Sequence, residues 1–243
     1  MKHIHRFFVS QSLTKGTSVC LDPDDSFHAC RVLRIKPGDF LELADPDGIV
    51  FTAKVMDTGR IVEVMTESEI VSKNPDTKPI LTVVQVLPSG KKMDLIVEKL
   101  SELGVDRLVP VFGDKSVARP TSGAGKLQRW RRVAKSAAAQ SKRERVMSVE
   151  EPLALRRWLD EKPGLFYVLS TEAEGKPLGV ALKDSGIPVT MLIGPEAGFS
   201  EVELDSFSDS GAVFVSLGSQ VLRTETASLV AAALVLHRLG ALG

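Results

Sequence analysis

Residues 192–200 read LIGPEAGFS, and this short stretch decides the class of the fold. Its apolar start predicts the end of a buried strand. Gly194, Pro195 and Gly198 then predict a shaped loop, because glycine accepts positive φ and close contacts while proline fixes φ. The final serine, with Glu203 three positions later, fits a capping box and predicts a helix start. A strand that passes through a glycine loop into a helix is typical of α/β proteins.

The same alternation continues on both sides of this stretch. ILTVVQVL (80–87) predicts a buried parallel strand, and apolar residues at helical spacing follow it until Gly104, which predicts the helix end. A last helix is predicted to begin near Thr224. The pattern as a whole predicts an α/β domain over residues 80–243, with further strands at 107–112, 165–170, 188–194 and 212–218.

Residues 1–71 follow a different, β-rich pattern. Short strands are predicted at HRFFV, DFLELAD, IVFTAKVM and RIVEVMTE, with DPDG as a turn. Asp22 as N-cap, Pro23 in the first turn and Asp25 predict one helix through DDSFHACRVL. The polar, proline-bounded SKNPDTKP at 72–79 predicts a linker between two domains.

Composition excludes several classes of protein. A chain of 243 residues with 43% hydrophobic residues is typical of globular domains with real cores. No apolar run approaches the roughly 20 residues that span a bilayer, and the first ten residues lack the features of a signal peptide. We therefore expect a cytoplasmic protein without a membrane partner. The two cysteines and four histidines show no ligand spacing, so no metal site is predicted.

The charge of the chain is balanced overall but not locally. Basic and acidic residues number 31 each, yet residues 126–145 contain eight Lys or Arg and one Glu. Such an asymmetry favours a phosphate-binding face, with an ordinary solvated helix as the alternative. Trp130 and Trp158 are expected in the core rather than as platforms for base stacking.

Three glycine-bearing loops follow predicted strands: LSTEAEG (169–175), IGPEAG (193–198) and LGSQVLRTETA (217–227). In open α/β sheets, ligands gather at the carboxyl ends of the strands. The chain has neither GxGxxG nor GxxxxGK[ST], which argues against the common NAD and ATP pockets. Glu196 suits a helix N-terminus as well as a functional role, and Arg223 and Glu225 either act in chemistry or pair with each other at the surface.

The final helix, TETASLVAAALVLHRL (224–239), is apolar on nearly every side. A helix of this kind must be covered all round. Burial within one subunit would satisfy it, but the pattern favours a homodimer interface.

These motifs together resemble the RsmE family of ribosomal RNA methyltransferases, in the SPOUT superfamily. LIGPEAGFS and LGSQVLRTETA are similar to the paired C-terminal signature of that family. The likeness extends over HACRVLRIKPGD, KKMDLIVEKLSELGV, KSVAR and RWRRVAKSAAAQSKR. Ala197 stands where the family usually has glycine, Lys115 where it usually has arginine, and Met147 where it commonly has proline.

The resemblance implies an N-terminal PUA-like β-barrel that helps to hold RNA, and an α/β domain with a C-terminal trefoil knot. It also implies S-adenosylmethionine as the cofactor, with the adenine held by main-chain groups, and a homodimer. The implied cofactor-binding residues are Leu169, Ser170, Thr171, Ile193, Gly194, Pro195, Gly198, Leu217, Gly218, Leu222, Thr224 and Thr226.

The reaction implied is methylation of N3 of a uridine in the decoding region of 16S rRNA, in the 30S subunit. Arg223 is expected to stabilise negative charge on the uracil, with Glu196 or Glu225 as the proton acceptor. Methyl transfer from a sulfonium needs no metal. The residues expected to contact RNA phosphates are Arg6, Arg31, Arg34, Arg129, Arg132, Lys135, Lys142 and Arg143.

Two other functions stay open at this point. One is a related knotted methyltransferase that acts on a ribose 2′-hydroxyl or on tRNA. The other is a non-catalytic RNA-binding module with the same fold. A dinucleotide oxidoreductase is excluded because the chain lacks a GxGxxG loop.

Overall fold

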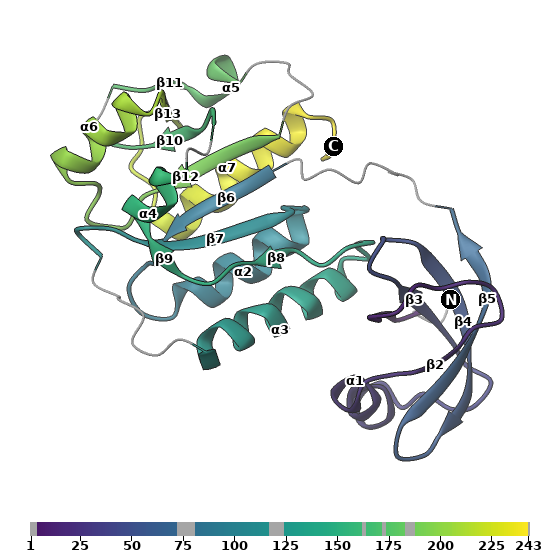
Figure 1. The fold of residues 1–243 in the computed structure, drawn as a ribbon. Coiled ribbons are helices and arrows are strands. Elements are labelled where there is room, and N and C mark those ends of the chain that lie inside the picture. Colours follow the sequence, from purple (N-terminus) through teal and green to yellow (C-terminus); the bar gives the residue numbers. More distant parts are fainter. Residues whose placement is uncertain are drawn as a thin grey trace. The chain divides into compact units, whose positions relative to one another are not determined.

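A computed structural model describes residues 4–71, 81–116, 124–161, 164–171, 174–182 and 188–242 (Figure 1). The chain forms two compact units. The first contains Met1–Thr77 and Ala138–Val146, and the second contains Lys78–Ala137 and Met147–Gly243. The predicted linker at 72–79 lies outside the described residues, and the predicted domain limits stay predictions.

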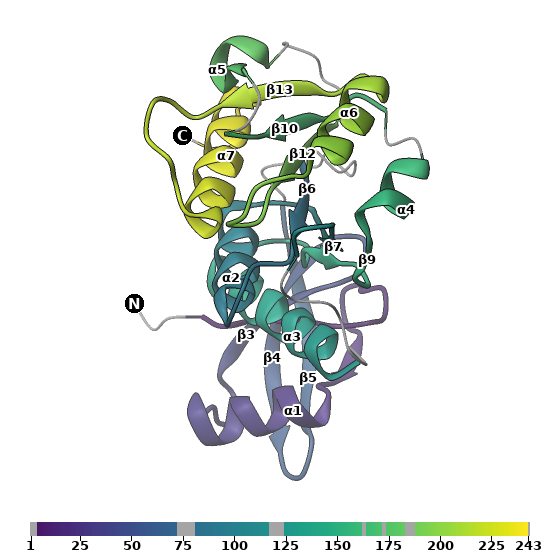
Figure 2. The same ribbon diagram turned by 90° about the vertical axis from the view of Figure 1, so that its left-hand side faces the viewer.

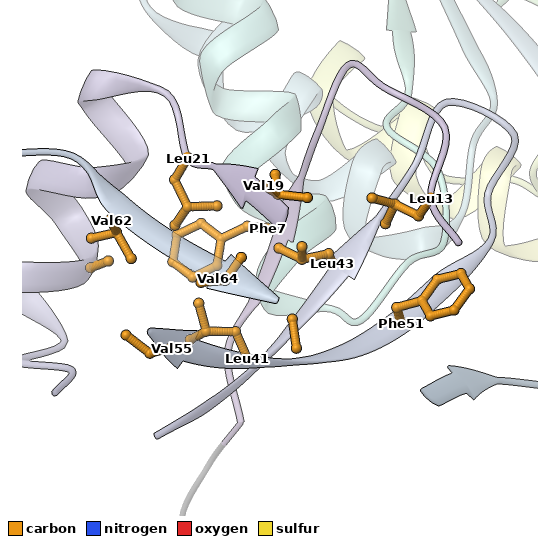
Figure 3. Packing of buried hydrophobic residues seen from close by; sticks show 12 residues of the cluster. Phe7, Leu13, Val19, Leu21, Leu41, Leu43, Phe51, Val55, Val62 and Val64 are labelled. Atoms are coloured by element: carbon orange, nitrogen blue, oxygen red, sulfur yellow. The ribbon is translucent and has the colours of Figure 1, made fainter. Parts of the chain in front are cut away.

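The N-terminal unit is built on a sheet of five described strands in the order β1-β3-β4-β5-β2. Neighbouring strands are antiparallel, except that β1 and β3 are parallel. Inward side chains alternate with exposed ones, so that Leu41, Leu43, Val62 and Val64 form a core that excludes water (Figure 3). The strands are β1 (Arg6–Phe8), β2 (Ser18–Cys20), β3 (Phe40–Ala44), β4 (Val50–Thr58) and β5 (Val62–Ile70).

The predicted helix of this unit forms, but it changes type halfway. Helix α1 (Pro23–Phe27) has the predicted N-cap, since the Asp22 side chain accepts a hydrogen bond from the Asp25 amide at 2.7 Å. A π-helical turn, η1 (His28–Val32), continues it. Arg34 ends the turn at a φ of 55°, a left-handed conformation that is uncommon outside glycine.

The C-terminal unit holds a parallel sheet in the order β11-β13-β10-β12-β6-β7-β8, with β9 also beside β7. Strand β6 is buried along almost its whole length, as its continuous apolar run predicts. The strands are β6 (Leu81–Val86), β7 (Arg107–Phe112), β8 (Ser148–Val149), β9 (Leu153–Ala154), β10 (Tyr167–Leu169), β11 (Lys176–Pro177), β12 (Val189–Ile193) and β13 (Val213–Ser216).

Helices cover both faces of this sheet (Figure 2). Helices α4 (Leu155–Asp160) and α6 (Glu201–Asp209) pack on one face, where Trp158 and Phe207 join the cluster around Phe166. Helix α7 (Thr224–Arg238) lies against α2 (Lys92–Leu103) and against β6 on the other face. The described helices also include α3 (Ala124–Gln140) and α5 (Leu178–Ala181).

Most of the predicted elements are confirmed, including the α2 stop at Gly104, whose φ is 109°. Strand β13 lies between β10 and β11, although it comes later in the chain than both. A Cβ on Gly175 would lie 2.7 Å from the Val215 carbonyl carbon, so the two main chains touch there. This strand order brings distant segments together at one end of the sheet, and the trefoil knot itself stays a prediction.

Candidate active site

The three glycine-bearing loops meet at one cavity of about 310 Å³. This volume lies at the lower end of the range for small-molecule pockets, about 300–1,000 Å³. Eleven of the twelve residues predicted to bind the cofactor line it, and exposed Thr226 on α7 does not. Glu196 lines it too, as do residues that the sequence did not single out: Phe199, Ser216, Ser219, Gln220, Val221 and Ala227.

The local sequence explains the shape of the LIGPEAGFS loop. A Cβ on Gly194 would come within 2.9 Å of the Phe199 ring, so this position accepts only glycine without a shift of the ring. The Gly198 amide donates to the Pro195 carbonyl at 3.1 Å, and Gly198 has a φ of 68°. Ala197 is exposed and is not among the described residues with positive φ, so it occupies the usual glycine position without backbone strain.

Side chains from other elements hold this loop along its length. The Thr224 hydroxyl donates to the Gly194 carbonyl at 2.7 Å. The Lys115 ammonium donates to the Phe199 carbonyl at 2.7 Å. The predicted capping box between Ser200 and Glu203 is present at the start of α6. These hydrogen bonds hold the loop in the shape that lines the cavity.

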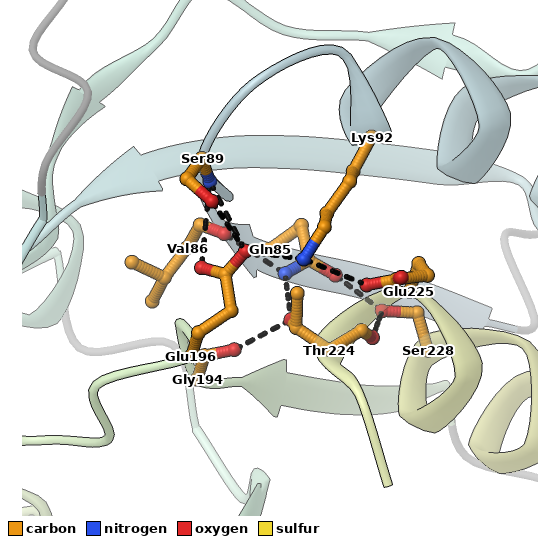
Figure 4. A network of polar contacts seen from close by, with 9 residues as sticks. All are labelled: Gln85, Val86, Ser89, Lys92, Gly194, Glu196, Thr224, Glu225 and Ser228. Carbon is orange, nitrogen blue, oxygen red and sulfur yellow. Dashed lines mark hydrogen bonds and ion pairs between the residues drawn. The ribbon is translucent and has the colours of Figure 1, made fainter.

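A buried polar network lies behind the cavity (Figure 4). Gln85, on β6, has no solvent exposure, and its amide nitrogen donates to the Thr224 hydroxyl at 3.0 Å and to the Val86 carbonyl at 2.8 Å. Ser228, one turn along α7, donates to the Gln85 amide oxygen and approaches the Thr224 carbonyl at 2.8 Å. Sequence reasoning missed Gln85, although it is the one polar residue in VVQVL.

The two candidate catalytic carboxylates share one lysine. The Lys92 ammonium lies 2.7 Å from Glu196 Oε1 and 3.5 Å from Glu225 Oε2. Ser89 also binds Glu196, through its hydroxyl at 2.8 Å and through its amide. Glu225 Oε2 is buried and accepts no hydrogen bond from the described residues, so the Lys92 charge is its main compensation.

The contacts of Glu196 determine how strong a base it is. Burial alone raises the pKa of Glu196, but hydrogen bonds from Lys92, from its own backbone and from Ser89 outweigh burial and lower that pKa to about 2. A carboxylate with so low a pKa is a weak proton acceptor near neutral pH. The same carboxylates raise the pKa of Lys92, with the hydrogen bond to Glu196 as the largest cause.

Arg223 stands immediately before α7, in the N-cap position. Arg223 is exposed to solvent, and its side chain makes no ion pair with the described residues. The alternative in which Arg223 and Glu225 pair with each other is wrong, because Glu225 turns to Lys92 instead. The guanidinium of Arg223 is thus available to a ligand beside the cavity-lining residues Leu222 and Thr224.

The predicted RNA-binding residues fall into two groups. Arg129 and Arg132 are exposed on α3, with Arg129 in an ion pair with Asp94 at 2.7 Å, and Lys135 on the same helix is half-buried. Arg31 and Arg34 are exposed in the N-terminal unit. Phe27, one helical turn before Arg31, is 65% exposed and was not singled out from the sequence.

The second group has structural partners within the N-terminal unit. Arg6 is buried, and its guanidinium binds Glu42 at 2.9 Å and the carbonyls of Lys142 and Arg143. The Lys142 ammonium binds Glu42 at 2.9 Å. Burial alone raises the pKa of Glu42, but Lys142 and Arg6 outweigh it and lower the pKa. Arg6 and Lys142 therefore join strands and the 138–146 segment through Glu42, which disfavours a direct role at phosphates.

Comparisons with known proteins agree with this geometry. Two family models match: an RNA methyltransferase domain over residues 76–236, and an RNA methyltransferase PUA domain over residues 21–63. The chain is 34% identical to the ribosomal RNA small subunit methyltransferase E of Mycobacterium bovis over 239 residues, covering 93% of this chain and 88% of that protein. The chain belongs to the RsmE family of ribosomal RNA methyltransferases.

Solved structures of relatives share the fold. The RsmE of Neisseria gonorrhoeae, bound to S-adenosyl methionine, has a TM-score of 0.87 and 31% identity, covering 96% of this chain and 97% of that chain. A Legionella pneumophila protein, in complex with the bound cofactor SAM, has a TM-score of 0.88 and 27% identity, covering 97% and 98% of the two chains. The predicted RsmE membership, PUA-like domain and α/β methyltransferase domain are confirmed.

The described residues contain neither a metal-binding cluster nor a membrane-spanning helix. Within those ranges, no group of three or more His, Cys, Asp or Glu side chains is placed to hold a metal ion. None of the helices in the described part of the chain is long and apolar enough to cross a membrane.

Proposed function

We propose that this RsmE-family protein transfers a methyl group from S-adenosylmethionine to N3 of a uridine in the decoding region of 16S rRNA. The observation that carries the proposal is the glycine-lined cavity at the carboxyl edge of the sheet. Its support is membership of a family whose N. gonorrhoeae relative was solved bound to S-adenosyl methionine. The substrate position follows from the resemblance of the C-terminal motifs to those of the family.

The residues around the cavity fit this cofactor. Apolar side chains such as Leu169, Ile193 and Leu217 suit an adenine ring, while the loops present main-chain donors and acceptors. Gly194 and Gly198 line the cavity, and the absence of a Cβ at each lets the loop keep its shape there. When bound, S-adenosylmethionine supplies an electrophilic methyl group on a sulfonium.

The chain must then supply the proton chemistry. Uracil N3 carries a proton at neutral pH and is a poor nucleophile until that proton leaves. We assign Arg223 to the negative charge that develops on the uracil carbonyls, because its guanidinium is exposed and has no ion-pair partner among the described residues. Glu225 is the stronger candidate for the proton acceptor, since Lys92 and Ser89 hold Glu196 as a weak base.

RNA binding is proposed for the exposed basic residues rather than for the whole predicted set. Arg31, Arg34, Arg129 and Arg132 are exposed, and Phe27 offers a ring beside Arg31 on which an unpaired base can stack. Arg143 and Lys135 stay in the proposed set, although both already have partners in the fold.

A double variant, Arg129→Gln with Arg132→Gln, tests this proposal. Removal of one phosphate-binding charge should lower the salt slope of RNA affinity by about 1, so the double variant should lower it by about 2. Fluorescence anisotropy of a labelled 16S rRNA fragment at several salt concentrations measures the slope. Arg156→Gln with Arg157→Gln, also exposed but on α4, is the matched control. An unchanged slope in the α3 variant would mean that the basic face of that helix is solvated and does not bind RNA.

We also propose a homodimer that covers the outer face of α7. Leu229, Val230 and Ala233 are half-buried there, and Leu234 is 43% exposed, so the described residues cover this apolar side of the helix only in part. The trefoil knot, the domain limits at 1–71 and 80–243, and a cytoplasmic location beside the 30S subunit belong to the same proposal.

Methylation of 30S subunits that lack the modification tests the central claim. The protein is incubated with these subunits and S-adenosylmethionine, and the RNA is digested and mapped by mass spectrometry. The expected product is N3-methyluridine at one position of 16S rRNA. A methyl group on a ribose 2′-hydroxyl or on tRNA would replace the proposal with the related methyltransferase, and no thermal shift with S-adenosylmethionine would favour a binding module.

A further inference from the structure

Gln85 is an unusual residue for its position. It lies on β6, whose other side chains are apolar apart from Thr82, and it has no solvent exposure. A buried amide is costly unless its donors and acceptor are all bonded. The partners of Gln85 satisfy it, and they come from its own strand and from α7, 139 and 143 residues later in the chain.

The hydrogen bonds around Gln85 have a fixed direction. The Val86 carbonyl only accepts, so the Gln85 atom 2.8 Å from it must be the amide nitrogen. The same nitrogen faces the Thr224 hydroxyl at 3.0 Å. The Gly194 carbonyl also only accepts, so the single proton of Thr224 points to it, over 2.7 Å. The order of donation is therefore Gln85 to Thr224 to Gly194.

The end of this chain of hydrogen bonds lies at the cavity. Gly194 and Thr224 both line it, whereas Gln85 does not. Pro195 has no N–H, so the Gly194 carbonyl is the only polar group of the peptide unit between them. The direction of that carbonyl, and with it the first turn of the LIGPEAGFS loop, depends on the proton that Thr224 supplies.

We propose that Gln85 is a positioning residue for the cofactor site: as an obligatory donor to Thr224, it commits the Thr224 proton to Gly194 and so fixes the wall of the cavity. The inference rests on the proposed function, because it takes S-adenosylmethionine as the ligand of that wall. The inference adds a residue that is needed for cofactor binding although it does not line the cavity. The residue behind the wall must leave the Thr224 proton to Gly194, which an acceptor of the same shape would not do.

The test is Gln85→Glu, which keeps the shape of the side chain but replaces the donor with an acceptor. At pH 8 the carboxylate draws the Thr224 proton to itself, and the Gly194 carbonyl loses its partner. Affinity for S-adenosylmethionine, measured by calorimetry, should fall about tenfold or more. At pH 5.5 the buried carboxyl is protonated, because burial raises its pKa. Its single proton can go to Val86 or to Thr224, and without the negative charge the Thr224 proton returns to Gly194. The affinity should then return to within about threefold of the original protein at the same pH.

Two matched variants distinguish the effect of hydrogen-bond direction from the effect of side-chain packing. Gln85→Met fills the same space without donor or acceptor and leaves the Thr224 proton on Gly194, so its loss should be smaller and should not depend on pH. Ser228→Ala removes a hydroxyl of the network but not the donor chain, and affinity should stay within about threefold. A packing role alone predicts equal losses for Glu and Met at both pH values.

A second readout does not need the cofactor. Amide hydrogen exchange of residues 194–200, in the protein alone, should be faster in Gln85→Glu than in Gln85→Met at pH 8. If the original protein does not bind S-adenosylmethionine but this difference is present, the proposed function fails and the positioning role stands. If the original protein binds and Gln85→Glu matches it in affinity and exchange, the positioning role is overturned.

Thr224→Val keeps the test decisive if Gln85→Glu does not fold. This change removes the donor to Gly194 directly, so affinity should fall about tenfold without recovery at pH 5.5. Affinity equal to that of the original protein would overturn the inference.

Discussion

Two of the loops that line the cavity are held in different ways. Loop 194–200 is bonded along its length by Thr224, Ser89, Lys92 and Lys115, and it ends in a capping box. Loop 217–222 is largely exposed, with Val221 at 81%, and the described contacts include no hydrogen bond to Ser219, Gln220 or Val221. The difference indicates that the first loop sets the binding geometry, while the second leads to Arg223 and the proposed chemistry.

The largest expected effect is a loss of methyl-transfer rate, and it comes from Arg223, which follows the exposed loop 217–222. Arg223→Ala should lower the rate of methyl transfer to 30S subunits by about 100- to 1,000-fold, because it removes charge stabilisation in the transition state. Affinity for S-adenosylmethionine should change little, since the side chain is not part of the cavity wall. Single-turnover kinetics and calorimetry measure the two quantities. Arg223→Lys should keep part of the rate, and an undiminished rate in Arg223→Ala would remove this residue from the mechanism.

A smaller effect is expected from the bonded loop, and it falls on binding. Gly194→Ala places a Cβ 2.9 Å from the Phe199 ring, and the required shift should destabilise the fold by about 1–3 kcal/mol. Affinity for S-adenosylmethionine should fall because the ring and the loop both line the cavity. Thermal unfolding and calorimetry check both results. Gly179→Ala, which meets no atom within 4 Å, is the control; equal behaviour of the two variants would contradict the close fit.

The smallest effect concerns the ion pair at the edge of the bonded loop. The pKa of Glu196 in the fold, about 2, is below its ordinary value of 4.5, so its stabilising contribution is present above pH 4.5 and is lost as pH falls towards 2. Lys92→Met removes the main source of this shift. Its melting temperature should therefore lie below that of the original protein at pH 6, and the gap should narrow as pH falls from about 4.5 towards 2.

Lys99→Met is the matched control for this prediction, because it breaks ion pairs with Glu98 and Glu102 on the same helix but away from the cavity. We expect it to leave cofactor affinity unchanged. A pH-independent gap in Lys92→Met would show that Lys92 acts through packing rather than through the charge on Glu196.

The sequence predicted the main elements of the fold because their signals are local. The buried run of β6, the helical spacing of α2 with its stop at Gly104, and the capping box at Ser200 all depend on residues a few positions apart. Strands β2, β8, β9 and β11 have only two or three residues, which is too short for a periodic pattern. The π-helical turn after Phe27 leaves no simple signal in the sequence either.

The candidate site likewise has features that the sequence predicted and features that it did not. The glycines and the apolar residues of the three loops were recognisable in the sequence because strand ends gather at one edge of a parallel sheet. The ion pairs of Lys92 with two carboxylates and of Arg6 with Glu42 were not recognisable, because the partners lie far apart in the chain. A basic residue in the sequence shows its charge but not the acid that neutralises it.

By itself, the sequence determined the alternation of strands and helices, the family and the loops that could form a cavity. Only the tertiary structure decided which charges remain exposed, which buried carboxylate oxygen accepts no hydrogen bond, and that Gln85 donates towards Gly194 through Thr224. The physical reason is that periodicity and turn chemistry act over a few residues, whereas hydrogen bonds and ion pairs depend on atoms that meet only when the sheet has assembled.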